Sequence, residues 1–137
     1  MPGPRRSDCP ISFALDLFGD RWTFLVIRDL MFKGKRRYSE FLASEEGMAT
    51  NILADRLRKL EGAGIVVRTQ AARNAGGLTY SLTEKGLDLA PLLVETVLWS
   101  AKHDASTAAD PAFVTAATLD RPAVLTAVRQ QHTDRTN

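Results

Sequence analysis

Side chains that can recognise the edges of base pairs recur at helical spacing in the middle of this chain. Residues 50–61 read TNILADRLRKLE, and Leu53, Leu57 and Leu60 follow the three- and four-residue steps of a buried helix stripe. The face opposite that stripe carries Asn51, Ala54, Asp55, Arg58 and Lys59. Asn pairs bidentately with adenine and Arg with guanine, while Ala can touch a thymine methyl group. We therefore predict that this face, with Thr50 at its start, reads DNA bases.

The carboxylate of Asp55 needs its own explanation, because it would repel phosphate. It could orient Arg58 on the same helix or accept a hydrogen bond from a cytosine amino group. The alternative for the whole face is ordinary solvation, since exposed helix faces are usually polar. The neighbouring elements favour DNA reading over solvation.

Those elements are a short helix before the reading helix and a β-hairpin after it. We expect a helix over residues 39–44, a tight turn at Gly47, and the reading helix over 51–61 with Thr50 as its N-cap. Residues 65–69 and 78–82 alternate as two strands around a Gly-rich loop at 72–77. This order gives a helix slim enough for a major groove and a loop that can reach the backbone beside it.

Several cations and small polar residues flank the reading helix and are candidates for phosphate contact. At the start of the first helix of the pair these are Lys35, Arg36, Arg37 and Ser39, and in the hairpin they are Arg68, Arg73 and Asn74. The alternative for the Lys35–Arg37 run is a solubilising helix terminus. Arg68 could equally form an ion pair with Glu61.

Helices are also expected on both sides of this segment. Residues 11–18 and 21–32 read as amphipathic helices, with Asp20 as the N-cap of the second. Thr83 should cap a helix that reaches about residue 103, with Pro91 kinking it or marking its first turn. That helix has two apolar faces, so we expect one face to meet a partner chain. Residues 106–111 read as a linker, 122–131 as one more helix and 133–137 as a loose tail.

Composition sets limits on the class of protein. The chain has 137 residues, 45% hydrophobic and 25% charged, which suits one globular domain with a helical extension. The net charge is +2, and residues 33–73 are more basic than the rest. Apolar runs are too short for a membrane span or a signal peptide, and a single cysteine excludes an internal disulfide. We therefore expect a cytoplasmic protein that works without a membrane or a cofactor.

The ordered motifs resemble the HxlR family of winged helix-turn-helix transcription regulators, which is itself similar to the MarR group. The resemblance runs from Cys9 to about Trp99. Its anchors are Cys9-Pro10, Leu15-Asp16, Gly19-Asp20-Arg21-Trp22, Arg37-Tyr38-Ser39-Glu40-Phe41, Leu53, Leu57-Arg58-Lys59-Leu60-Glu61, Gly64-Ile65-Val66, Tyr80-Ser81-Leu82-Thr83 and Gly86. It implies a mainly α fold with a small β-hairpin: a winged helix-turn-helix domain over residues 11–104. A flexible arm (1–10) would precede the domain, and an extension of one helix and a loose tail (105–137) would follow it.

The resemblance further implies a homodimer on a palindromic operator, with repression as the expected outcome. The N-terminal helix and the long helix after the hairpin would form the interface, through Phe13, Leu17, Leu93, Val97 and Trp99. Cys9 stands where some members carry a sensor of oxidants or electrophiles. Here Arg5 and Arg6 could lower the pKa of the thiol while Asp8 opposes them, and an unreactive packed thiol is the alternative.

The sequence offers three alternative roles beside DNA reading. A thiol enzyme could pair Cys9 with His103 or His132, but the sequence suggests no orienting third residue, metal-ligand spacing or phosphate loop, so we expect no catalysis. A winged helix used only for protein contact would display exposed aromatics instead of the cations found here. A small-molecule effector could bind among Phe13, Phe18, Trp22 and Trp99, although aromatics at helical spacing more often form core.

Overall fold

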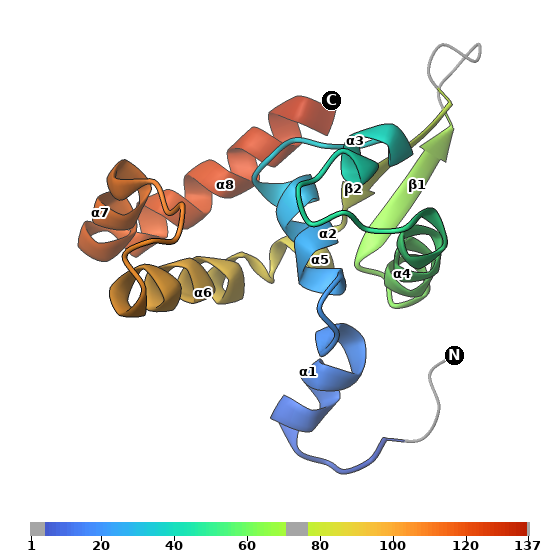
Figure 1. Cartoon of the computed structure of the whole chain (residues 1–137), viewed down its shortest axis with the longest axis horizontal. Helices are drawn as coiled ribbons and strands as arrows, with labels where there is room; N and C mark the ends of the chain where they lie inside the picture. The colour runs from blue at the N-terminus through green and yellow to red at the C-terminus, as the bar shows by residue number, and fades with distance from the viewer. Residues whose placement is uncertain (1–4, 71–76, 137) are drawn as a thin grey trace.

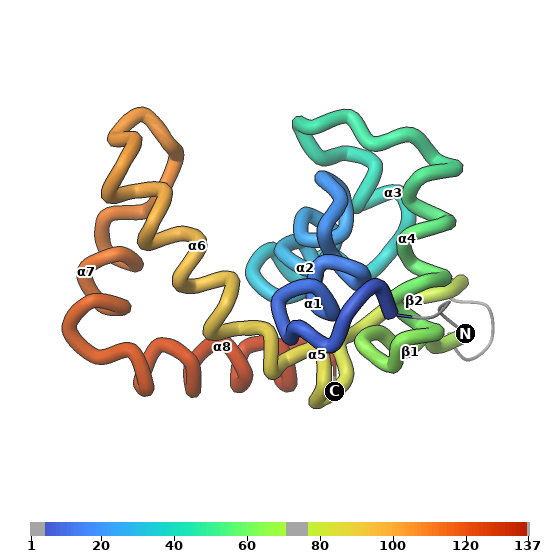
Figure 2. The backbone as a smooth tube through the Cα atoms, turned by 90° about the horizontal axis from the view of Figure 1, so that it is seen from below, coloured from blue at the N-terminus to red at the C-terminus, as the bar shows by residue number. Residues whose placement is uncertain are grey.

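A helix-rich body with a projecting β-hairpin and a second group of helices make up the molecule. The computed structural model describes residues 5–70 and 77–136 (Figures 1 and 2). Its helices are α1 (Pro10–Phe18), α2 (Thr23–Met31), α3 (Tyr38–Leu42), α4 (Thr50–Gly62), α5 (Glu84–Leu87), α6 (Ala90–His103), α7 (Pro111–Leu119) and α8 (Arg121–Thr136). Strands β1 (Val66–Gln70) and β2 (Leu78–Leu82) pair antiparallel, with Val66 opposite Leu82 and Gln70 opposite Leu78.

The hydrophobic core lies around α2, which contacts α4, β2 and α8. Val26 and Ile27 from α2 pack with Leu53 and Leu57 from α4 and with Ile65 at the start of the hairpin, and all five are buried. Burying one such side chain stabilises the fold by about 2 kcal/mol. The predicted leucine stripe of the reading helix is therefore the face that fixes α4 to the body.

The helix pair forms as predicted, with a different cap. Gly47 adopts φ 71° in the turn between α3 and α4, the left-handed conformation expected there. The prediction that Thr50 caps α4 was wrong, because Thr50 is already helical and Ala49, which has no side-chain acceptor, stands at the N-cap. Helix α3 spans Tyr38–Leu42 instead of 39–44, and the Glu40 carboxylate accepts from the backbone N–H groups of Arg36 and Arg37.

Helices α2 and α6 both begin later than the sequence suggested. Asp20 does accept from the backbone N–H groups of Trp22 and Thr23, but residues 21 and 22 form a turn and α2 starts at Thr23. Thr83 caps only α5, by accepting from the N–H of Gly86. A second helix, α6, begins at Ala90, because Pro91 has no N–H to continue the first one and suits an opening turn.

The C-terminal extension is folded, which corrects two predictions. Residues 111–119, to which the sequence assigned no element, form α7, capped by Asp110, whose carboxylate accepts from the N–H of Ala112. The predicted loose tail belongs to α8, which runs along the body to Thr136 (Figure 1). Its last turn is fixed to α2, because the guanidinium of Arg135 donates to the carbonyl of Met31 at 3.3 Å.

His132 joins α8 to the base of the hairpin. Its Nε2 accepts from the backbone N–H of Leu82 at 3.1 Å, and the side chain is buried. Burial lowers the pKa of His132, and the nearby positive charges of Arg36 and Arg135 lower it further. The neutral imidazole that the bond requires is thus the favoured form, and His132 has a structural role instead of the basic one that a thiol enzyme would need.

Most apolar side chains of α6 are buried or half-buried within one chain, whereas Leu92 and Trp99 are exposed. One face buries Ala90, Leu93 and Val94 in the core, and α7 and α8 pack against α6 (Figure 2). Leu93 is 5% exposed, so its assignment to a dimer interface was wrong: its partners are in its own protomer. Trp99, by contrast, is 64% exposed.

A helix-turn-helix followed by a two-stranded wing is the winged helix-turn-helix arrangement, and the predicted mainly α fold class is confirmed. Among the described residues, no helix is long and apolar enough to cross a membrane. The same residues contain no cluster of His, Cys, Asp and Glu that could hold a metal ion.

Replacing His132 with Ala should destabilise the fold by about 2 kcal/mol, because it leaves the buried N–H of Leu82 without an acceptor and opens a cavity. Urea unfolding measures this, with the exposed neighbour variant Gln131→Ala as the control.

Because folding lowers the pKa of His132, the contribution of this side chain to stability is complete above the unfolded pKa of 6.5 and is lost as the pH falls below it. The difference between wild type and His132→Ala should therefore shrink from about pH 7.5 to pH 5.5. Equal stability of the two proteins at neutral pH would contradict this role.

Candidate nucleic-acid interface

The outer face of α4 displays the side chains predicted to read bases. Arg58 and Lys59 are each 71% exposed at the side chain, and Thr50 and Asn51 are also exposed. Ala54 and Asp55, on the same face, are half-buried. The leucines underneath hold the helix against α2, α3 and β1, so the face is presented by a rigid element.

Asp55 organises the cations of this face. Its carboxylate pairs with Arg58 at 3.3 Å and with Lys59 at 3.3 Å, and it also accepts from Arg56. Desolvation raises the pKa of Asp55, but the bonds from Lys59 and Arg56 outweigh it, so the pKa lies below its usual value. Asp55 thus contacts Arg58 in the unbound protein, as one of the two explanations for this carboxylate predicted. A base edge could replace Asp55 as the hydrogen-bond partner of Arg58.

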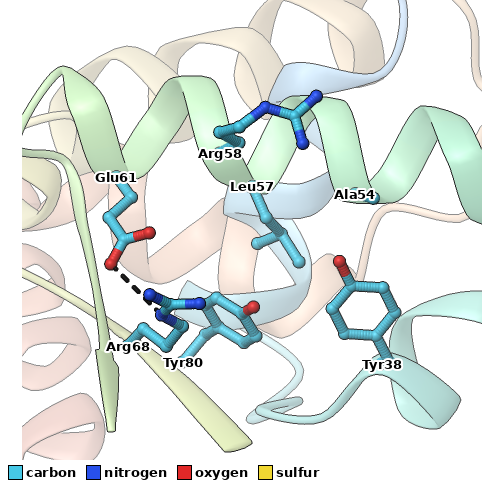
Figure 3. Close-up of a pocket in the computed structure, with 7 residues that line it drawn as sticks. All are labelled: Tyr38, Ala54, Leu57, Arg58, Glu61, Arg68 and Tyr80. Carbon is cyan, nitrogen blue, oxygen red and sulfur yellow. Dashed lines mark ion pairs between the residues drawn. The ribbon is translucent and has the colours of Figure 1, made fainter.

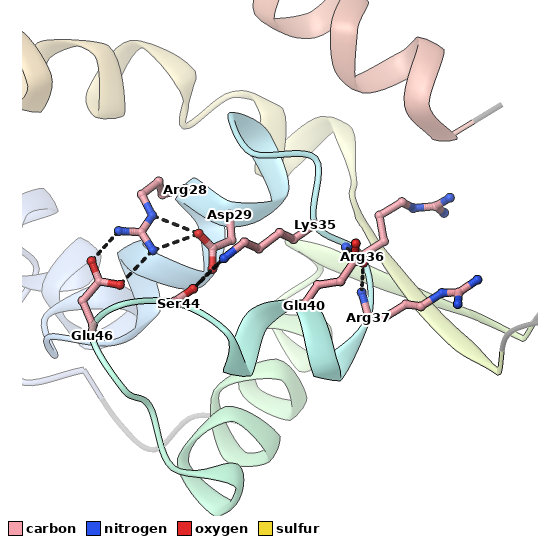
Figure 4. Close-up of polar contacts among 8 residues, drawn as sticks. All are labelled: Arg28, Asp29, Lys35, Arg36, Arg37, Glu40, Ser44 and Glu46. Carbon is pink, nitrogen blue, oxygen red and sulfur yellow. Dashed lines mark hydrogen bonds and ion pairs between the residues drawn. The ribbon is translucent and has the colours of Figure 1, made fainter. Parts of the chain in front are cut away.

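A polar network anchored by Asp29 stabilises the turn before α3 (Figure 4). The Asp29 side chain is 1% exposed and accepts from Arg28 at 3.0 Å and from the Ser44 hydroxyl at 2.7 Å. Arg28 also pairs with Glu46 at 2.7 Å, which lowers the pKa of Glu46 to about 2. Lys35 lies inside this network, with its ammonium 2.7 Å from the Ser44 hydroxyl and 3.5 Å from Asp29. The structure therefore gives Lys35 an internal partner in place of the expected phosphate.

The side chain of Arg36 also has hydrogen-bond partners within the protein, whereas that of Arg37 is exposed. The guanidinium of Arg36 donates to the carbonyl of Tyr80 at 3.4 Å and to the carbonyl of Arg135 at 3.5 Å, so it joins the hairpin to α8. The Arg37 side chain is exposed and extends away from the Asp29 network (Figure 4). Ser39, at the second position of α3, is exposed. Of the three candidate cations before α3, only Arg37 is exposed.

The wing contributes Arg68, which lies on β1 and pairs with Glu61 of α4 at 3.5 Å. Both groups are substantially exposed, at 52% and 39%, so the pair is weak. A hollow of about 220 Å³ opens beside it, between α4, α3 and the wing (Figure 3). Burial raises the pKa of Tyr80, whose hydroxyl lies at this hollow. The candidates Arg73 and Asn74 lie outside the described residues.

An ion pair that the sequence reasoning missed connects α4 to the start of α2. Arg56 Nε lies 2.7 Å from the Asp20 carboxylate, which also accepts from the Thr23 hydroxyl at 2.5 Å. Burial raises the pKa of Asp20, but these hydrogen bonds lower it to about 2. Arg56 directly precedes Leu57 of the buried stripe. This position, at the edge of the face that packs on the body, was the sequence feature that could have predicted an ion pair within the protein.

Helix α1 projects from the body and carries the sensor candidate at its start (Figure 1). Within the described chain α1 buries none of its own residues, and Phe13 is exposed while Leu17 is half-buried. Phe18 stacks on Phe24 of α2, with ring centroids 4.7 Å apart. Cys9 is an exposed free thiol at the N-cap of α1. Arg6, which was expected to act on Cys9, pairs instead with Asp16 at 3.1 Å.

Known proteins share this arrangement. The model of HxlR-like helix-turn-helix proteins matches residues 17–107. The chain belongs to the HxlR-like helix-turn-helix family of transcriptional regulators. The HTH-type transcriptional regulator sll1512 of Synechocystis is 40% identical over 86 residues, which cover 63% of this chain and 63% of the relative. The HTH-type transcriptional regulator YvaP of Bacillus subtilis is 35% identical over 107 residues, covering 77% of this chain and 94% of the relative.

A solved structure adds a relative with a known response. The redox regulator HypR in its oxidised form superposes with a TM-score of 0.62 at 33% identity, covering 69% of this chain and 96% of that chain. The family match ends at residue 107, so all of α7 and α8 lies beyond it. These two helices are additions to the part of the chain that matches the HxlR-like family.

The Asp20–Arg56 pair of this HxlR-like protein should contribute about 1 kcal/mol of coupling in a double-mutant cycle of Asp20→Asn and Arg56→Gln, after allowance for solvent screening. Because folding lowers the pKa of Asp20 from 3.8 to about 2, this contribution is present above pH 3.8 and is lost as the pH falls toward 2. Thermal unfolding at neutral and acidic pH measures it. Asp104→Asn, combined with Arg56→Gln, is the control, since the Asp104 carboxylate accepts only from Ser106 in the described structure and has no contact with Arg56. Additive effects of the two substitutions would contradict the coupling.

Proposed function

We propose that this chain is a sequence-specific regulator that binds double-stranded DNA as a homodimer on a palindromic operator and represses transcription from it. The observation that carries the proposal is the outer face of α4, where Asn51, Arg58 and Lys59 project from a helix fixed by its opposite leucine stripe. A helix of this width enters a major groove, and its amide and guanidinium groups match the acceptors of adenine and guanine there. Thr50, Ala54 and Asp55 complete the reading set. Such a regulator acts in the cytoplasm, where bacterial DNA lies.

Phosphate contacts position this helix without reading sequence. Arg37 and Ser39 are exposed at the start of α3, where this class of motif crosses the backbone. Arg68 supplies the same chemistry from the wing, and Arg73 and Asn74, which lie outside the described residues, remain candidates from the sequence alone. Together these groups would bring the wing onto the backbone beside the major groove while α4 lies within it.

The homodimer is supported by the apolar surface of α1 and α6. Ile11, Phe13 and Leu15 are exposed on α1, and Trp99 and Leu92 are exposed on α6. An apolar helix with no buried residue is stable when a partner covers it, and a second copy of the chain supplies the same two surfaces in return. Leu17 and Val97 border them. Two copies of α4 then read two half-sites about 34 Å apart, one turn of DNA.

Cys9 is the proposed sensor of an oxidant or electrophile. Its thiol is exposed at the N-cap of α1, next to the surface assigned to the dimer. HypR, with which this fold superposes, is a redox regulator. Modification of Cys9 would change the packing of α1 against the partner and so change the spacing of the two reading helices.

Arg58→Ala and Asn51→Ala should each weaken binding to the operator by about 1–3 kcal/mol and relax base preference at one position of each half-site. Fluorescence anisotropy on duplexes from the promoter beside the chain's own gene measures this, and sedimentation of the complex should give two chains per operator. Lys102→Ala, on α6, is a control that also removes one exposed cation. Unchanged affinity of both variants would show that α4 does not read bases, and failure of the wild type to bind any duplex would favour a protein-interaction module.

Treatment with diamide or a quinone should reduce operator affinity of the wild type at least about tenfold and leave Cys9→Ser unaffected. Mass spectrometry identifies the adduct or disulfide at Cys9, and dithiothreitol should reverse a disulfide. Full operator affinity of a protein fully modified at Cys9 would refute the sensor assignment.

A further inference from the structure

The hollow between α4 and the wing is lined by hydrogen-bond donors. Its walls come from four elements: Tyr38 from α3, Ala54, Arg58 and Glu61 from α4, Arg68 from β1 and Tyr80 from β2 (Figure 3). The two tyrosine rings lie 6.0 Å apart between centroids, and their hydroxyls point toward the hollow (Figure 3). The small side chain of Ala54 leaves space on the helix wall. At neutral pH this surface offers two phenol donors and two guanidinium groups.

One acidic group, Glu61, stands among these donors. Its carboxylate is 3.5 Å from Arg68 Nε and otherwise faces solvent, with 39% of the side chain exposed. An exposed ion pair of this kind is weak and is exchanged easily for a stronger anion. Glu61 thus places Arg68 at the edge of the hollow through an ion pair weak enough for another anion to replace.

The position of the hollow identifies its occupant, if α4 and the wing bind DNA as proposed above. A helix in the major groove and a wing over the neighbouring minor groove are separated by one strand of the phosphate backbone. That strand must cross the angle between α4 and the hairpin, which is where the hollow opens.

We infer that the hollow binds one phosphodiester of this strand, with Tyr38 and Arg68 as its donors, and that Arg68 exchanges Glu61 for the phosphate when DNA binds. Tyr80 forms the floor, where its buried ring packs against Phe41 and its hydroxyl faces the same anion. Guanidinium groups match phosphate geometry, and a tyrosine hydroxyl donates to it without adding charge. Glu61 then turns to solvent.

Three substitutions separate this role from a structural one. Arg68→Ala should weaken binding about tenfold and Tyr38→Phe about fivefold, equally on the operator and on an unrelated duplex, because a phosphate contact carries no sequence information. Arg68→Ala should also reduce the salt slope by about one. Glu61→Gln should strengthen binding several-fold, because it releases Arg68 and removes a repelling charge. If the Glu61–Arg68 pair only supported the fold, Glu61→Gln would weaken binding as Arg68→Ala does.

The measurement is anisotropy of a labelled duplex between about 50 and 200 mM salt. Arg121→Ala, on α8, is the matched control, because it removes a partly exposed arginine that is also paired with a glutamate. A scan of single methylphosphonates then locates the contact: the wild type should lose affinity at one phosphate per half-site, and Arg68→Ala should be insensitive at that phosphate.

The possible results are distinct. A wild type that binds no duplex refutes the proposed function itself. A wild type that binds its operator, with no change in affinity or slope in the three variants and no phosphate at which Arg68→Ala differs from it, refutes the hollow as a phosphate site. Unchanged duplex binding together with Arg68-dependent binding of inorganic phosphate would assign the hollow to a free phosphate compound and overturn the proposal.

Discussion

The buried carboxylate of Asp29 is the contact on which the reading surface depends. At 1% exposure an unpaired charge would cost several kcal/mol, so the fold must bring donors to it. Arg28 comes from the same helix, Lys35 from beyond the Gly34 turn, and Ser44 from the turn after α3. These three donors fix the chain path from α2 through α3. The turn after α3 leads into α4, so this satisfied carboxylate fixes the chain path up to α4, and the leucine stripe then packs that helix against the body.

Helices α7 and α8 lie beyond the residues that match the HxlR-like family, and contacts from α8 fix the position of the wing. The β2 strand has one edge paired with β1, and its other edge offers N–H groups at Tyr80 and Leu82. Tyr80 donates to the carbonyl of Arg36, and Leu82 donates to His132 of α8. A short two-stranded hairpin is marginal by itself. Here α8 completes its outer edge and holds the guanidinium of Arg36 there, so the wing keeps a fixed angle to α4, and the hollow between them keeps its shape.

The sequence predicted those features that arise from local periodicity. The leucine stripe located α4, the alternating residues located both strands, and Gly47 located the turn. Polar contacts between distant residues were not predictable in this way: Lys35 meets Asp29 only because Gly34, at φ 66°, reverses the chain. His132 is 50 residues from Leu82 in sequence, so its burial had no local signal. Helix α7 was missed because its small residues and weak apolar periodicity resemble a linker, although Asp110-Pro111 is a good helix start.

The route from α1 to the reading helix follows from the same contacts. Helix α1 buries none of its own described residues, so its direction depends on Phe18 against Phe24 and on the backbone that Asp20 organises. Asp20 also accepts from Arg56, and Arg56 shares Asp55 with Arg58 and Lys59. A change in α1 therefore reaches the cations of the outer face of α4 through two carboxylates. In the proposed dimer, where the partner covers α1, rotation of that helix would alter both the spacing of the two reading helices and the orientation of Arg58. DNA tolerates little error in that spacing, because the half-sites are fixed by the helical repeat. If Cys9 is the sensor proposed above, an event at this thiol, at the other end of α1, would need to move that helix only slightly to release the operator.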